Sequence, residues 1–144
     1  MKKYNYFDCK PASIPSDSSV HLFPTKDEND IYNKKEYARI IGILRYAIDC
    51  TIPDIAYAVG VLAIFTSKPN FGHWNAMTQL MRYLKRIVHY GLLYQRYHAV
   101  LEGYSDASWN ILSGDSLSTT GYVFTIGGGA ISWTSKKQDR KRVV

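Results

Sequence analysis

The spacing of apolar residues changes once along the chain, from a helical period to a strand period. From residue 33, apolar side chains recur at intervals of three and four, as expected for one stripe of an amphipathic helix. This predicts a helix over about 34–48. Its apolar stripe consists of Tyr37, Ile40, Ile41, Leu44 and Ile48.

Two more helices are predicted before residue 98. The second is expected to begin at Thr51, because Thr-Ile-Pro-Asp offers a hydroxyl cap, an early proline and an acid, and to stop at Lys68-Pro69-Asn70. The third is expected from about His73 to His89, with Gly91 placed to end it. Its predicted inner face is formed by Trp74, Met77, Met81, Leu84 and Val88.

Beyond residue 98 the apolar period shortens toward two. Three stretches rich in β-branched and aromatic residues, Val100–Trp109, Gly121–Ile126 and Ala130–Ser135, are separated by turn-forming residues. Gly127-Gly128-Gly129 fits a hairpin turn better than a phosphate-binding loop, because no phosphate-loop motif surrounds it. The chain is therefore predicted to be α+β, with about three helices followed by a three-stranded antiparallel meander. Four aromatic residues are expected to form the sheet core, with base stacking as the alternative: Tyr104, Trp109, Tyr122 and Trp133.

Composition divides the chain into three parts. Residues 1–32 form a leader rich in Pro, Ser and Asp, which is expected to be extended and to lie over the surface. Residues 33–98 form the helical segment, and residues 99–144 the sheet segment. Charge follows this division, since residues 97–135 contain no Lys or Arg.

The overall balance excludes several classes of protein. With 144 residues, 46% hydrophobic and 21% charged, the chain has the composition of a folded domain rather than of a disordered one. Its longest mainly apolar run, 52–65, is too short to span a bilayer, so no membrane partner is expected. No apolar stretch follows the basic start, so an intracellular location, cytoplasmic or nuclear, is expected. The net charge of +6 favours anionic partners such as nucleic acid.

Three strings near the C-terminus are Gly103–Trp109, Ser118–Phe124 and Ile131–Gln138. In their residues, order and spacing they resemble the start of the ribonuclease H domain in copia-type retrotransposon Pol polyproteins. Upstream, Pro53–Val59 and Arg82–Lys85 resemble the segment that connects the reverse transcriptase to that domain. The resemblance implies a connection segment over 33–98 and an incomplete ribonuclease H-like fold over 99–144.

The resemblance also implies a chemistry, hydrolysis of the RNA strand of an RNA–DNA hybrid. In the family four acidic residues hold two Mg²⁺ ions that clamp the attacking and leaving oxygens. The first acid corresponds to Asp106, whereas the other three have no counterpart before Val144, and neither Glu102 nor Asp115 is placed to substitute. The paired aspartates of the reverse transcriptase are also missing. We therefore expect no enzyme activity and no cofactor in this chain, with Asp106 a vestigial catalytic carboxylate and at most a weak, incomplete metal ligand.

A basic helix face suggests a second function. Arg82, Lys85 and Arg86 are candidate nucleic-acid-binding residues, because neutralised phosphates supply most nonspecific affinity, and an RNA–DNA hybrid is the candidate ligand. The alternative is an ordinary solvated face.

Two other interpretations stay open. A ribonuclease H sheet reduced to three strands would expose an edge, which predicts marginal stability or self-association. Parts of the chain also resemble proteins described as secreted effectors of plant pathogens, although Arg82-Tyr83-Leu84-Lys85 only approximates an Arg-x-Leu-Arg export motif.

Overall fold

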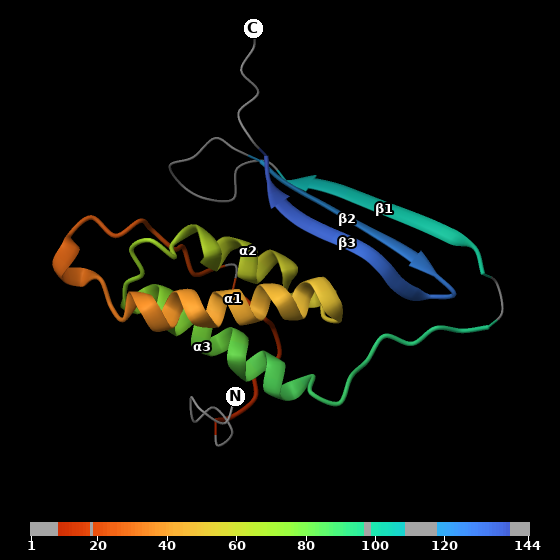
Figure 1. The fold of residues 1–144 in the computed structure, drawn as a ribbon, viewed down its shortest axis with the longest axis horizontal. Helices are drawn as coiled ribbons and strands as arrows, with labels where there is room; N and C mark the ends of the chain where they lie inside the picture. The colour runs from red at the N-terminus through yellow and green to blue at the C-terminus, as the bar shows by residue number, and fades with distance from the viewer. Residues whose placement is uncertain (1–8, 18, 97–98, 109–117, 139–144) are drawn as a thin grey trace, which may run out of the picture. The chain divides into compact units, whose positions relative to one another are not determined.

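The computed structural model describes residues 9–17, 19–96, 99–108 and 118–138. These residues form three α-helices followed by a three-stranded antiparallel sheet (Figure 1), which confirms the predicted α+β class. The chain divides into two compact units, Met1–Tyr90 and Gly91–Val144. The division thus falls before Gly91, whereas the sequence pattern places it after residue 98.

The helical unit is built on one apolar core. Its helices are α1 (Lys34–Cys50), α2 (Ala56–Ile64) and α3 (Phe71–Arg86). The Tyr37 hydroxyl, fully buried on α1, donates a hydrogen bond to the Leu62 carbonyl of α2 at 2.9 Å. The core is formed by Tyr37, Ile40, Ile41, Leu44, Ile55, Ala58, Val59, Leu62, Met77, Leu80, Met81, Leu84 and Ile87.

The link between α1 and α2 differs from the prediction. The Thr51 backbone N–H donates to the Ala47 carbonyl at 2.9 Å, so this residue closes α1 instead of opening the next helix. Its hydroxyl lies 3.4 Å from the same carbonyl and cannot cap another helix. A short 3₁₀ turn, η3 (Pro53–Ile55), leads into α2, and the predicted hydroxyl cap is wrong.

The C-terminal end of α3 also differs. The helix ends at Arg86, where the Ile87 N–H donates to the Tyr83 carbonyl, so Gly91 lies beyond the cap. Val88 falls outside the helix and is 62% exposed, and its predicted place on the inner face is wrong. Leu80, which the predicted inner face leaves out, is fully buried on that side of α3.

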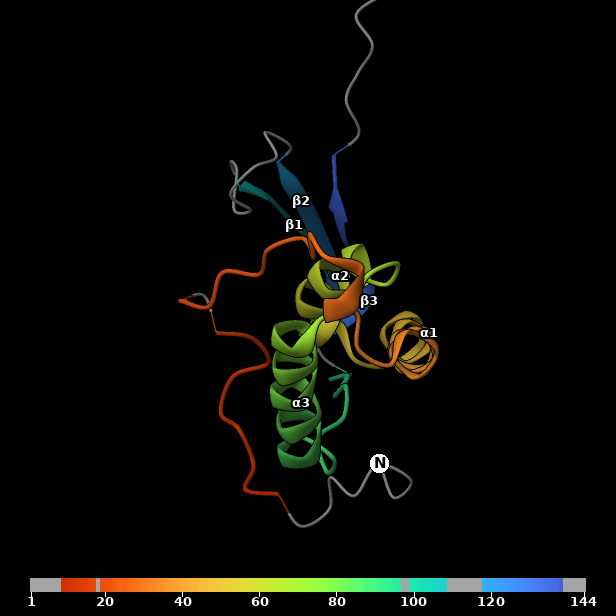
Figure 2. The same ribbon diagram turned by 90° about the vertical axis from the view of Figure 1, so that its left-hand side faces the viewer.

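The described part of the leader lies against the helices. One 3₁₀ turn, η2 (Glu28–Asp30), interrupts an otherwise extended path beside α3 (Figure 2). The Thr25 hydroxyl donates to the Lys68 carbonyl at 2.7 Å. Further along, the Trp74 indole N–H donates to the Tyr32 carbonyl at 2.8 Å. The leader is therefore held by a hydrogen bond from its Thr25 side chain and one to its Tyr32 backbone, as well as by packing of Leu22 against the core.

The sheet is a meander with strand order β1-β2-β3, as predicted. Its strands are β1 (Leu101–Ser108), β2 (Thr119–Ile126) and β3 (Gly129–Lys137). Gly127 and Gly128 join the last two strands with φ of 57° and 78°, the left-handed region that a tight hairpin requires and that glycine adopts without steric cost. The predicted glycine turn is confirmed.

The aromatic residues of the sheet do not form a buried core. Tyr104 is 58% exposed and Tyr122 is 41% exposed, Trp133 is half-buried, and Trp109 lies outside the described residues. A sheet buries a face only against a second layer, and the described part of the unit Gly91–Val144 contains no such layer. The predicted aromatic core is therefore wrong for the described residues.

None of the described helices is long and apolar enough to cross a membrane.

Candidate nucleic-acid interface

Three cations lie close together on the C-terminal half of α3. Arg82, Lys85 and Arg86 are three and four residues apart, so their side chains leave the helix on one side. Lys85 and Arg86 occupy the last turn, where positive charge also complements the helix dipole. We call these three residues the basic surface.

The leader contacts this basic surface directly. Arg82 Nε donates to the Lys10 carbonyl at 2.6 Å, and Lys85 Nζ donates to the Cys9 carbonyl at 2.8 Å. The Arg86 side chain is exposed. Two of the three predicted nucleic-acid-binding residues therefore already bind a stretch of the chain's own backbone, a relation that the sequence pattern does not reveal.

An acidic residue lies near the basic surface. Asp54 Oδ2 accepts a hydrogen bond from the Tyr83 hydroxyl at 3.3 Å. Burial and the nearby Asp54 carboxylate raise the pKa of Tyr83, whereas Arg86 acts in the opposite direction. Tyr83 is thus a neutral hydrogen-bond donor at physiological pH, and its partner carboxylate reduces the positive field on that side of α3.

Asp106 lies on β1 opposite Gly121 of β2 and is exposed. Its Oδ1 accepts a hydrogen bond from the Ala107 N–H at 2.8 Å. A shallow hollow of about 470 Å³ adjoins it, lined by Ser105, Asp106, Ala107, Thr120, Gly121, Tyr122 and Thr134. Apart from Asp106, this lining carries hydroxyl and apolar groups only.

The described residues do not fit a pair of Mg²⁺ ions at Asp106. Two metals about 3.5–4 Å apart require several carboxylate oxygens around one point. Glu102 is four residues away on the same strand, roughly 13 Å at the rise of an extended chain, and its carboxylate lies 3.4 Å from the Thr125 hydroxyl. Across the described ranges, no three His, Cys, Asp or Glu side chains are grouped to hold a metal. Asp115 lies outside these ranges.

The start of α3 carries a capping box that was not predicted from the sequence. Asn70 Oδ1 accepts the His73 N–H at 3.1 Å, and His73 Nδ1 accepts the Asn70 N–H at 2.9 Å. The helix consequently begins at Phe71 rather than at the predicted His73. Asparagine followed three residues later by a side chain that can accept a hydrogen bond was the signal available in the sequence.

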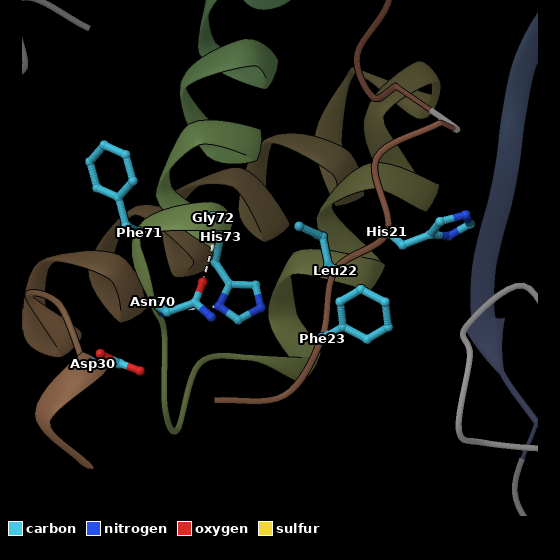
Figure 3. Close-up of a pocket in the computed structure, with 8 residues that line it drawn as sticks. All are labelled: His21, Leu22, Phe23, Asp30, Asn70, Phe71, Gly72 and His73. Carbon is cyan, nitrogen blue, oxygen red and sulfur yellow. Dashed lines mark hydrogen bonds between the residues drawn. The ribbon is translucent and has the colours of Figure 1, made fainter. Parts of the chain in front are cut away.

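His73 is the buried polar residue beside this cap. Its ring stacks on Phe65 with centroids 4.0 Å apart, and burial lowers its pKa, an effect that the backbone of Phe23 partly opposes. A neutral imidazole is what the cap requires, because Nδ1 acts as an acceptor there. The adjoining pocket, of about 390 Å³, lies between this helix start and the leader (Figure 3). Its lining consists of His21, Leu22, Phe23, Asp30, Asn70, Phe71, Gly72 and His73.

Comparison with known proteins identifies several sequences that are similar to this chain. No protein-family model and no solved structure matches it. It is 38% identical over 96% of its length to a retrovirus-related Pol polyprotein from transposon TNT 1-94 of Nicotiana tabacum. It is 34% identical, also over 96% of its length, to a retrovirus-related Pol polyprotein from transposon RE2 of Arabidopsis thaliana. The chain spans 11% and 9% of the lengths of these two relatives.

A third relative has a different description. The chain is 45% identical over 71% of its length to secreted RxLR effector protein 161 of Plasmopara viticola, and covers 72% of that protein. The transposon relatives match nearly the whole chain, from the leader through the sheet. The chain therefore belongs to the copia-type, retrovirus-related Pol polyproteins, as its sequence motifs indicate.

Proposed function

We propose that this chain is a segment of the reverse transcriptase and ribonuclease H region of a copia-type Pol polyprotein, and that alone it does not hydrolyse nucleic acid. The sheet would correspond to the first strands of a ribonuclease H-like fold. The observation that supports the absence of catalysis is the setting of Asp106, an exposed carboxylate in a hollow whose other described residues are hydroxyl or apolar. One carboxylate supplies too few oxygen ligands for two Mg²⁺ ions, so we also propose that the chain takes no cofactor.

Hydrolysis of a labelled RNA–DNA hybrid tests this proposal. The chain, its Asp106→Asn variant and a Glu102→Gln control are each incubated with Mg²⁺ or Mn²⁺. We expect no metal-dependent cleavage above background in any of the three. Cleavage by the unaltered chain that is abolished in Asp106→Asn and retained in Glu102→Gln would contradict the proposal, because it would require further carboxylates to reach Asp106.

A second candidate function is weak nucleic-acid binding through the basic surface. The observation that favours it is the grouping of Arg82, Lys85 and Arg86 on one side of α3. Interactions of this kind bind phosphates irrespective of base sequence, with dissociation constants of about 10⁻⁴–10⁻⁶ M at physiological salt. An RNA–DNA hybrid is the ligand that the family suggests.

Titration at two or more salt concentrations tests this binding. Replacing Arg82 and Lys85 with glutamine should weaken binding and reduce the slope of log K against log salt by about 1 for each phosphate that is no longer neutralised. Replacing Arg39 and Arg45 with glutamine is a matched control, because it also removes two positive charges and both residues are exposed on α1 of the same unit. Equal weakening in the control would mean that net charge alone, and not the basic surface, attracts the hybrid.

The effector-like alternative has less support in the structure. The string that approximates an export motif, Arg82-Tyr83-Leu84-Lys85, lies within α3, where Leu84 belongs to the core and both cations bind the leader. A receptor could not read this string in an extended form without unfolding the helix. We therefore propose a cytoplasmic or nuclear location, which a secretion assay on tagged chain would contradict if it recovered the folded protein outside cells.

The sheet also suggests a partner, a second copy of this chain. Glu102 and Asp106 lie on the edge strand β1, whereas Lys136 and Lys137 lie on the opposite edge strand β3. Opposite charge favours pairing of β1 in one copy with β3 in another, since the outer strand of an antiparallel sheet can add a further strand by backbone hydrogen bonds. Sedimentation velocity should show an average mass that rises with protein concentration and falls with salt. A single monomeric species up to about 100 μM, a usual range for weak association, would contradict this proposal.

A further inference from the structure

One short segment of the leader is bound to the basic surface by three hydrogen bonds. Besides the bonds from Arg82 and Lys85 to the Lys10 and Cys9 carbonyls, the Ala12 N–H donates to the Arg82 carbonyl at 3.3 Å. Cys9, Ala12, Arg82 and Lys85 are all half-buried. Leader residues 9–12 therefore occupy one donor on each of two cations that a phosphate would contact.

The leader and a phosphate compete for these two side chains. Each carbonyl takes one donor, the Nε–H of the Arg82 guanidinium or one of the three ammonium N–H groups of Lys85. Both side chains are also half-buried beside the leader, so a phosphate reaches those donors only by displacing residues 9–12. A phosphate oxygen is the stronger acceptor, because its hydrogen bonds to cations are charge-assisted. The carbonyls, however, belong to the same chain, so their effective concentration at the surface is high.

We propose that leader residues 9–12 mask the basic surface in cis, and that a nucleic-acid backbone binds there by displacing them. This inference rests on the nucleic-acid binding proposed above. It predicts that the apparent affinity for nucleic acid is lower than the intrinsic affinity. The apparent association constant equals the intrinsic one multiplied by the fraction of molecules whose leader is detached. Loosening the leader should therefore tighten binding of the same ligand.

A proline substitution can loosen the leader without changing charge. Ala12→Pro removes the N–H that donates to the Arg82 carbonyl and introduces a ring against that carbonyl. Ser16→Pro is the matched control, because it also follows a proline in the leader and lies at an exposed position. For Ala12→Pro we expect about three- to tenfold tighter binding to an RNA–DNA hybrid, the effect of removing roughly one hydrogen bond or more from the masked form. For Ser16→Pro we expect no change.

The unaltered chain provides a second readout through its two cysteines. Cys9 lies in the masking segment and is half-buried, whereas Cys50 is exposed at the end of α1 and serves as an internal reference. Saturating RNA–DNA hybrid should raise the rate of Cys9 alkylation several-fold relative to Cys50, because the segment leaves the helix. An unchanged or lower rate would overturn the proposal, since the segment would then remain in place under the hybrid.

The two proposals fail in different ways. If glutamine at positions 82 and 85 leaves affinity unchanged, the basic surface does not bind nucleic acid, and the masking proposal falls with it. If those substitutions weaken binding while Ala12→Pro binds like the unaltered chain, the surface is right and the masking proposal is wrong. Tighter binding by Ala12→Pro but not Ser16→Pro, with faster Cys9 alkylation, supports both.

Discussion

In the helical unit, Met1–Tyr90, apolar side chains from three helices bury one another, whereas in the sheet unit, Gly91–Val144, backbone hydrogen bonds join strands whose side chains remain largely exposed. Leu80 on α3 is fully buried, while Leu101 on β1 is 62% exposed. In the described part of the sheet unit the buried residues are Gly127 and Gly129, which have no side chain to pack.

The difference shows that the two patterns of apolar residues carry different information. The apolar stripe of each helix packs against neighbouring helices of the same unit, so its burial stabilises that unit. An alternating strand needs a second layer to cover its face, and here Tyr122, Phe124 and Ile126 on one face of β2 are each more than a third exposed. The sheet therefore exposes apolar side chains on this face, as expected for a surface that packs against another protein segment.

The largest expected effect compares the same substitution in the two units. Leu80→Ala should lower the free energy of unfolding of the helical unit by about 3 kcal/mol, because it leaves a cavity in the core. Leu101→Ala should change stability by less than about 0.5 kcal/mol, since that side chain is exposed. Denaturant unfolding followed by circular dichroism at 222 nm measures both. Equal effects would mean that the contrast in burial does not hold in solution.

The hairpin turn should be the most sensitive point of the sheet. An added Cβ at Gly127 would lie 2.5 Å from the Gln95 carbonyl oxygen, whereas one at Gly128 would meet nothing within 4 Å. Both positions have positive φ, so Gly128→Ala should cost about 1–2 kcal/mol from backbone strain alone. Gly127→Ala should cost about 1 kcal/mol more, because it also displaces the hydrogen bond from the Gln95 N–H to the Gly127 carbonyl. Amide exchange along β2 and β3 would report the difference.

The buried hydroxyl of the helical unit should have a smaller effect. Tyr37→Phe removes the hydrogen bond to the Leu62 carbonyl and should cost about 1 kcal/mol in the free energy of unfolding. Tyr46→Phe, at a position 73% exposed on the same helix, should cost almost nothing. A cost at Tyr46 equal to that at Tyr37 would show that burial of the hydroxyl is not what matters.

The smallest expected effect is a pH dependence confined to the helical unit. Burial lowers the pKa of His73 below its ordinary value of 6.5, so the unfolded chain binds more protons than the folded one as pH falls through that value. Stability of this unit should therefore be greatest above pH 6.5 and decline as pH falls from there toward the lower pKa of the folded state. The slope should disappear in His73→Gln and persist in His89→Gln, an exposed control.

Much of the fold could be predicted from the sequence because it depends on local physics. Periods of 3.6 and 2 residues identified three helices and three strands, and two consecutive glycines identified the turn that requires positive φ. Five motif strings, in order, indicated the Pol family that the relatives show. Each of these signals lies within a few residues of the feature that it predicts.

One local contact also departs from the prediction: Thr51 closes α1 instead of capping the next helix, because the Ala47 carbonyl accepts from both its N–H and its hydroxyl. Tertiary contacts decided the rest. The aromatic residues of the sheet stay exposed because burial depends on a covering layer, which no spacing within a strand encodes. Arg82 and Lys85 were identified from helical spacing, but their binding to leader carbonyls joins residues more than 70 positions apart. Only the folded chain brings such distant groups within hydrogen-bonding distance, and so only the structure shows that two of the three cations of the basic surface already bind the leader.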